Sequence, residues 1–255
     1  MVFLSMRFFL LLALLAMFAP LAQAQTWVNQ RMTVQVPDGH LHGSLLLPKT
    51  DAPLPVALLI AGSGPTDRNG NNPLGHNDSL KRLAQALAKR GIASVRYDKR
   101  GVGQSQPVAP DESQLKVEDY VDDAVAWSRL LQADPRFSSL VLIGHSEGAL
   151  IASLAEPTVK PAALLSLAGS GRPIDALLRE QLQGRLPPAL LASAYYLIDE
   201  LNAGRIHQQV PEPLQVLFRL SVQPYLISLF QEDPAAAFAN TTAPALIIQG
   251  SHDIQ

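Results

Sequence analysis

The fold is decided by one stretch of the chain, LVLIGHSEGALIASLAE at residues 140–156. It opens with an apolar run typical of a buried β-strand and continues with a pattern typical of a helix. Between the two lies Ser146, with Gly144 two residues before it and Gly148 two residues after it. A serine at such a junction passes through a tight, strained turn, and glycines are needed where side chains would otherwise collide.

This turn gives Ser146 two interpretations. In the first, its hydroxyl is lifted above the edge of a sheet as a nucleophile, and the first amides of the following helix lie where an oxyanion would form. In the second, Ser146 is an ordinary helix N-cap after a buried strand. The Gly-x-Ser-x-Gly pattern is short and occurs by chance, so the strand-to-helix context is what favours the nucleophile.

Strands and helices alternate on both sides of this junction. The later strands are apolar throughout, which is typical of a parallel sheet covered by helices on both faces. The first two strands, around the turn PDGH, are expected to form an antiparallel hairpin at the sheet edge. The sequence therefore predicts an α/β fold. The expected strands are residues 31–36, 41–48, 54–62, 92–98, 139–144, 162–169 and 243–250, and the expected helices are residues 78–91, 117–134 and 146–156.

The alternation stops between about residues 171 and 240. This segment has the pattern of several helices, interrupted by LPP (186–188) and VPEP (210–213). It is too long for a plain connection between neighbouring strands. We expect it to form a helical cap over the carboxyl edge of the sheet, where open parallel sheets bind their ligands.

The first 24 residues have the layout of a secretory signal peptide. Arg7 precedes an apolar run from Phe8 to Ala19, and Ala22-Gln23-Ala24 provides a cleavage motif before Gln25. The run has about 12 residues, fewer than the roughly 20 that a spanning helix needs, so a retained membrane anchor is the weaker alternative. We expect residues 25–255 to form an exported α/β domain, with no stable membrane insertion after cleavage.

The composition is that of a globular protein. Hydrophobic residues make up 47% of the 255 positions, and the formal net charge of −2 argues against a nucleic-acid partner. The chain has no cysteine, which excludes disulfides and thiolate catalysis. Export without cysteine favours a bacterial periplasm. His40 and His42 lie on one strand face, but without a third ligand we expect no metal there.

Three motifs together resemble those of the α/β-hydrolase family. GHSEG (144–148) resembles its nucleophile elbow, and YDKRGVGQS (97–105) resembles the Asp-x-Arg-Gly-x-Gly-x-Ser loop after its fourth strand. IAGSGPTDRNGNN (60–72) resembles the His-Gly-x loop after its third strand, with Ala61 in place of the usual His. The sequence of this last loop is most similar to bacterial esterase-like members of the serine aminopeptidase S33 (hydrolase-4) branch. The resemblance covers nearly everything after the expected signal peptide and implies an α/β-hydrolase fold.

The resemblance also implies roles for individual residues. Ser146 would be the nucleophile, and the backbone N–H groups of Ser63 and Glu147 would form the oxyanion hole, with Gly62 or Gly64 as alternatives to Ser63. Asp253 follows the last expected strand and matches the position of the catalytic acid, a solvated loop aspartate being the alternative. Acyl transfer by such a triad uses no cofactor. Asp98 and Arg100 are expected to stabilise their loop, and DRNGNN (67–72) to form a surface turn rather than a pocket entrance.

The family order of serine, acid and histidine calls for a histidine after Asp253. Ordinary element lengths would place it roughly 25–40 residues further on, whereas the sequence ends at Gln255. His76 in a loop and His207 in the expected cap are poor substitutes. We therefore expect a truncated form of a longer enzyme that lacks the last helix, the last strand and the catalytic His. Alone, it would be nearly inactive and poorly soluble, because its last strand would be an exposed apolar edge.

These features predict a serine hydrolase that cleaves esters of small or apolar acyl groups through an acyl-enzyme. An aminopeptidase or amidase of the same fold is an alternative, and its cap would need a carboxylate such as Asp199, Glu200 or Glu212 to hold the substrate ammonium. A non-catalytic binding protein is a further alternative, against which strain at Ser146 argues. The cap is rich in residues that suit an apolar acyl group but that a helical core also needs: Tyr195, Tyr196, Phe218, Tyr225 and Phe230.

Overall fold

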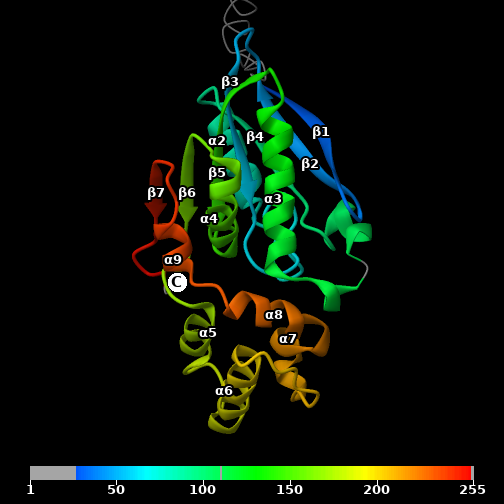
Figure 1. The fold of residues 1–255 in the computed structure, drawn as a ribbon, viewed down its shortest axis with the longest axis vertical. Coiled ribbons are helices and arrows are strands. Elements are labelled where there is room, and N and C mark those ends of the chain that lie inside the picture. Colours follow the sequence, from blue (N-terminus) through cyan, green and yellow to red (C-terminus); the bar gives the residue numbers. More distant parts are fainter. Residues whose placement is uncertain (1–26, 110, 254–255) are drawn as a thin grey trace, which may run out of the picture.

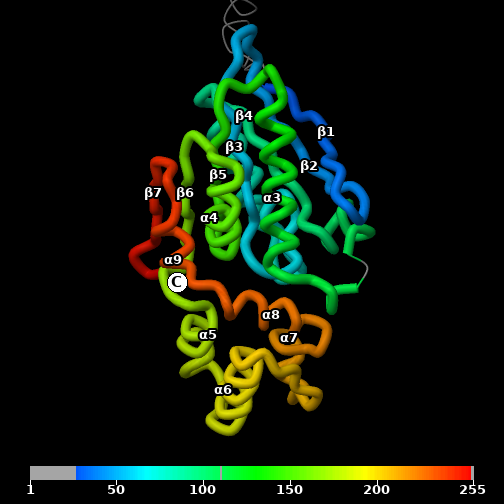
Figure 2. Tube along the Cα trace, viewed as in Figure 1, coloured from blue at the N-terminus to red at the C-terminus, as the bar shows by residue number. Residues whose placement is uncertain are grey.

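The structure, a computed structural model, describes residues 27–109 and 111–253. The expected signal peptide at residues 1–24 lies outside them. The centre of the fold is a seven-stranded sheet in the order β1-β2-β4-β3-β5-β6-β7 (Figures 1 and 2). The strands are Trp27–Val36 (β1), Gly39–Pro48 (β2), Leu54–Ile60 (β3), Ala93–Tyr97 (β4), Phe137–His145 (β5), Ala163–Leu167 (β6) and Ala245–Ile248 (β7).

The pairing of the strands confirms the predicted topology. β1 pairs antiparallel with β2, and β2 pairs antiparallel with β4. From β4 to β7 every neighbour is parallel. The predicted hairpin therefore lies at one edge of a parallel sheet, and β7 lies at the other edge. The α/β prediction is confirmed.

Helices cover both faces of the sheet, as the apolar strands predict. In β3, Leu58 packs with the core on one face and Leu59 with the core on the other, and both are fully buried. Helix α2 (Ser79–Ala88) buries Ala84 against the second of these faces. Helices α3 (Val117–Gln132) and α4 (Glu147–Val159) cover the first face, where Trp127 is the largest fully buried side chain (Figure 1).

The predicted cap is a helical unit beyond the carboxyl ends of the parallel strands (Figure 1). It has its own apolar core, built around Leu197, Phe218 and Phe230. Glu112 accepts hydrogen bonds from the side chains of Arg219 and Ser221, which ties the cap to the loop before α3. The cap helices are α5 (Ile174–Leu182), α6 (Pro188–Asn202), α7 (Gln215–Phe218) and α8 (Gln223–Phe230).

One part of the range predicted for the cap belongs instead to the main body. Helix α9 (Pro234–Ala239) lies beside α4, and its Phe238 packs against the main core (Figure 1). The Asp233 carboxylate accepts hydrogen bonds from the N–H groups of Ala235 and Ala236, which fixes the start of this helix. The cap therefore ends before residue 233, and the boundary at 240 is about two helical turns too late.

β7 is an open edge strand. Leu246, Ile247 and Ile248 are each exposed to at least half of their full area, so the apolar edge that the sequence predicts is present. In the part of the chain that the structure describes, no helix combines the length and apolarity needed to cross a bilayer.

Candidate active site

Ser146 lies at the strand-to-helix junction in a strained backbone conformation. Its φ is 53° and its ψ is −120°, a region that residues with a side chain rarely occupy. The first helical hydrogen bond runs from the N–H of Ala149 to the carbonyl of Ser146, yet the Ser146 side chain makes no capping hydrogen bond. An ordinary N-cap residue has an extended conformation and a capping side chain. Ser146 therefore occupies the N-cap position of α4 without the backbone conformation or the side-chain hydrogen bond of an ordinary N-cap serine.

The two elbow glycines are required by close backbone approach. A Cβ atom at Gly148 would lie 2.3 Å from the carbonyl oxygen of Ile60, at the end of β3. A Cβ atom at Gly144 would lie 2.1 Å from the carbonyl oxygen of Gly148. Any side chain at either position would push strand and helix apart, so Gly144 and Gly148 let the turn at Ser146 stay tight.

The loop after β3 lies directly against Ser146. A Cβ atom at Gly62 would be 3.2 Å from the Cβ atom of Ser146. Thr66 holds the loop by donating a hydrogen bond from Oγ1 to the Ser63 carbonyl, at 3.0 Å. The loop that carries Ser63 therefore lies beside Ser146, and Glu147 begins the helix that follows Ser146.

Asp253 is brought to the same edge of the sheet. It follows β7, and its N–H donates a hydrogen bond to the Gly250 carbonyl at 3.1 Å. Burial lowers the pKa of His145, the residue before Ser146, and the negative charge of Asp253 opposes that lowering. Asp253 is thus close enough to the elbow for its charge to act there, while its side chain stays exposed.

The two histidines considered as substitute bases lie in other surroundings. His76 is exposed in the loop between β3 and α2. His207 belongs to the cap, where its ring packs edge-on against Tyr196 with 5.2 Å between the centroids. Among the described residues there is no group of three or more His, Cys, Asp or Glu side chains that could hold a metal ion.

The loop of residues 97–105 is fastened to its neighbours by its charged residues. Burial by itself would raise the pKa of Asp98, but hydrogen bonds from the backbone and guanidinium of Arg68 outweigh it and hold that pKa below its ordinary value. Arg100 pairs with the fully buried Asp123 on α3. Asp98 and Arg100 thus stabilise their loop, as the sequence predicts.

The segment DRNGNN is more than a surface turn. Asn71 is buried, and its side-chain oxygen accepts hydrogen bonds from the N–H groups of Asn77 and Asp78. Asn69 accepts a hydrogen bond from Arg96 of β4. The surface-turn prediction is wrong in this respect, because these polar side chains bind the segment to the start of α2 and to the sheet.

Sequence reasoning did not single out Lys99, although it contacts both flanks of Ser146. Its Nζ atom donates a 2.6 Å hydrogen bond to the Gly62 carbonyl and lies 3.7 Å from Oε1 of Glu147. The signal that could have found it is a lysine two residues after the end of the buried strand β4, inside the family-like motif.

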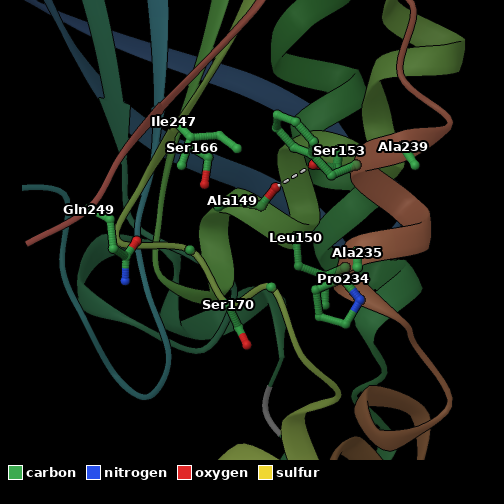
Figure 3. Close-up of a pocket in the computed structure, with 13 residues that line it drawn as sticks. Ala149, Leu150, Ser153, Ser166, Ser170, Pro234, Ala235, Ala239, Ile247 and Gln249 are labelled. Carbon is green, nitrogen blue, oxygen red and sulfur yellow. Dashed lines mark hydrogen bonds between the residues drawn. The ribbon is translucent and has the colours of Figure 1, made fainter. Parts of the chain in front are cut away.

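A cavity of about 350 Å³ lies beside α4 (Figure 3). It starts at the first turn of the helix that follows Ser146, and Ser146 is not among its lining residues. The walls come from α4, α9 and the ends of β6 and β7, with Ala149, Leu150, Ser166, Pro234, Ile247 and Gln249 among the lining residues.

Comparisons with known proteins concern the sequence and the fold of the chain. Residues 74–182 match the family model of serine aminopeptidase, S33. The chain is 27% identical over 216 residues to Esterase EstD of Thermotoga maritima, a match that covers 84% of this chain and 50% of the relative. The chain therefore spans about half the length of the curated relative it matches.

Solved structures share the fold across different activities. Est1E from Butyrivibrio proteoclasticus, determined with ferulic acid, has a TM-score of 0.62 at 18% identity, covering 86% of this chain and 78% of that one. Acetyl xylan esterase from Paenibacillus sp. R4 has a TM-score of 0.57 at 15% identity, covering 93% and 82%. Acylaminoacyl peptidase from Pyrococcus horikoshii has a TM-score of 0.56 at 16% identity, covering 89% and 32%.

At these identities the structural likeness establishes the fold alone, because an acetyl xylan esterase and an acylaminoacyl peptidase both share it. The sheet order, the elbow at Ser146 and the sequence matches lead to one conclusion. The chain has the α/β-hydrolase fold, and over residues 74–182 its sequence is similar to the serine aminopeptidase, S33, family.

Proposed function

We propose that this protein is a serine hydrolase that cleaves carboxylic esters of small or apolar acyl groups. The observation that carries the proposal is the conformation of Ser146, with a positive φ at a tight strand-to-helix turn. Such strain has a cost and persists where the surrounding structure enforces it, as at catalytic sites. It argues against a purely binding role for the fold.

In the proposed reaction, Oγ of Ser146 attacks the acyl carbonyl carbon, and its proton passes to a base. We assign the base to an imidazole oriented by Asp253, in the family order of serine, acid and histidine. The carbonyl oxygen becomes an oxyanion that accepts hydrogen bonds from the N–H groups of Ser63 and Glu147. The ester C–O bond then breaks, the alcohol leaves with the proton, and water releases the acid from the acyl-enzyme by the same steps.

The charges in the cap favour esters over peptides with a free amino terminus. An aminopeptidase needs a carboxylate available to the substrate ammonium. Asp199 is instead paired with Arg179, with 2.6 Å between Nη2 and Oδ1, and Glu200 is paired with Arg205 at 2.7 Å. Glu212 is exposed in a short 3₁₀ helix. These pairings support an uncharged acyl group as the substrate.

The preference for a small or apolar acyl group is supported by the cavity beside α4, whose walls include Leu150, Pro234 and Ile247. The cap aromatics give less support than their number suggests. Phe218 and Phe230 pack inside the cap core, and Tyr225 packs in the main core. We also propose, from the pattern of residues 1–24, that the protein is exported to a bacterial periplasm.

The substrate class is tested by comparing hydrolysis rates of the full-length gene product on two chromogenic series. We expect p-nitrophenyl acetate and butyrate to be hydrolysed with a kcat/KM at least about 100-fold above that for leucine p-nitroanilide, because the cap carboxylates of Asp199 and Glu200 are already paired with arginines. A higher kcat/KM for the aminoacyl anilide would contradict the ester assignment and favour the aminopeptidase alternative.

A further inference from the structure

The buried side chain of Lys99 joins the two elements that flank Ser146. Its Nζ atom donates a hydrogen bond to the Gly62 carbonyl oxygen, with 2.6 Å between the two atoms. The same Nζ atom lies 3.7 Å from Oε1 of Glu147, and both side chains are at most 5% exposed. It also lies 5.1 Å from the centre of the Tyr120 ring, within the range of a cation–π interaction.

The contacts matter because each partner of Lys99 is covalently linked to a proposed oxyanion-hole donor. The Gly62 carbonyl and the Ser63 N–H belong to one planar peptide group. A hydrogen bond donated to that carbonyl fixes the plane in which the N–H points, and it polarises the peptide so that the N–H becomes a stronger donor. Glu147, the other partner of Lys99, carries the second N–H proposed for the oxyanion hole. The ammonium group of Lys99 therefore contacts the peptide that carries the Ser63 N–H and the side chain of the residue that carries the second N–H.

We propose that Lys99 is a positioning residue that sets the direction and strength of the two oxyanion-hole donors, Ser63 and Glu147. This inference rests on the proposed function, since it needs an oxyanion to form beside Ser146. Lys99 does not touch the substrate. It acts on the transition state through the Gly62–Ser63 peptide and through the carboxylate of Glu147.

The surroundings of the pair keep its charges from being screened by water. Burial lowers the pKa of Lys99, and the Glu147 carboxylate opposes that lowering. Tyr225 of cap helix α8 is 9% exposed, and its ring meets that of Tyr120 edge-on with 5.5 Å between centroids. Burial, followed by the charge of Glu147, raises the pKa of Tyr225, so its hydroxyl stays neutral beside the pair. Electrostatic effects of Lys99 on nearby peptides are stronger in such a dry site.

A purely structural ion pair is the competing explanation, and it makes a different prediction. Removing one partner of a buried pair leaves an uncompensated charge and destabilises the fold, whereas removing both charges restores stability. If Lys99 served stability alone, activity would recover together with stability. If Lys99 positions the donors, stability recovers and kcat does not.

The experiment measures kcat, KM and thermal melting for the full-length gene product acting on p-nitrophenyl butyrate. The variants are Lys99→Met, Glu147→Gln, and the double variant Lys99→Met/Glu147→Gln. Lys89→Met, at an exposed lysine after α2, is the matched control. Ser146→Ala reports separately on the proposed function.

We expect Lys99→Met to lower kcat by about 10- to 100-fold with KM within about threefold, less than the 10²- to 10³-fold loss typical of deleting a donor. The double variant should melt closer to the wild type than Lys99→Met does, yet keep the low kcat. Should Lys99→Met fail to fold, the double variant carries the comparison, because it buries no unpaired charge. Lys89→Met should match the wild type.

Two results would overturn the inference. The first is recovery of both kcat and stability in the double variant, which would show that Lys99 has a structural role only. If Ser146→Ala is inactive in the same experiment, the proposed function still stands. Wild-type rates in Ser146→Ala would instead overturn the proposed function, and the positioning role with it.

Discussion

Replacing Ser146 with alanine is expected to lower kcat for p-nitrophenyl butyrate by about 10⁴-fold or more. The alanine variant lacks the oxygen that forms the acyl-enzyme, so the reaction stops after substrate binding. Stability should change little, because the substitution removes a single oxygen atom that does not cap α4. The melting temperature shows whether the variant is folded, and kcat and KM for the residual reaction show whether the loss lies in the chemical step.

Ser193→Ala is the matched control for this substitution. Ser193 lies on cap helix α6, where its hydroxyl donates a hydrogen bond to the Ala189 carbonyl one turn earlier. Its rates should equal those of the wild type. A Ser146→Ala variant that folds and keeps more than about a tenth of the wild-type kcat would place the nucleophile elsewhere, since a removed nucleophile cannot leave so much activity.

Replacing Gly144 with alanine should have the largest effect on folding. Its new Cβ atom would lie 2.1 Å from the Gly148 carbonyl oxygen and 2.5 Å from the Cα atom of Ala149. Both are backbone atoms, so the first turn of α4 has to move away from β5. We expect the free energy of unfolding to fall by about 3 kcal/mol or more, and kcat to fall by at least about 100-fold, because the turn at Ser146 relaxes.

This effect is measured by urea unfolding followed through the fluorescence of the buried Trp127, together with ester hydrolysis. Gly75→Ala is the control, because a Cβ atom at Gly75 would have open space within 4 Å and the φ of Gly75 is not positive. It should leave both quantities unchanged. A Gly144→Ala variant as stable and as active as Gly75→Ala would show that the elbow does not depend on close packing of strand and helix.

The elbow and the sheet were predictable because their signals are local. Gly144 and Gly148 flank Ser146 at fixed spacing, and the strands are continuous apolar runs ended by glycine or polar residues. The right-handed crossovers of parallel sheets then limit the strand orders that such a pattern can adopt. Such features need no knowledge of distant contacts.

The features that the sequence did not reveal depend on residues far apart in the chain. Lys99 gains its meaning from Gly62 and Glu147, which lie 37 and 48 positions away and meet it in the folded structure. The sequence around Phe238 resembles that around the cap aromatics. Only its packing against the main core shows that α9 belongs to the main body. The polar residues of DRNGNN resemble a solvent-exposed turn until their partners on α2 and β4 are known.

The central claim, that the hydroxyl of Ser146 is an activated nucleophile, is tested most directly by mapping a covalent probe. The full-length gene product is treated with a fluorophosphonate, digested, and analysed by mass spectrometry. We predict a single stoichiometric adduct on Ser146, absent from the Ser146→Ala variant and slowed in Lys99→Met. An adduct on another residue, or none on Ser146 in an ester-hydrolysing preparation, would contradict the account.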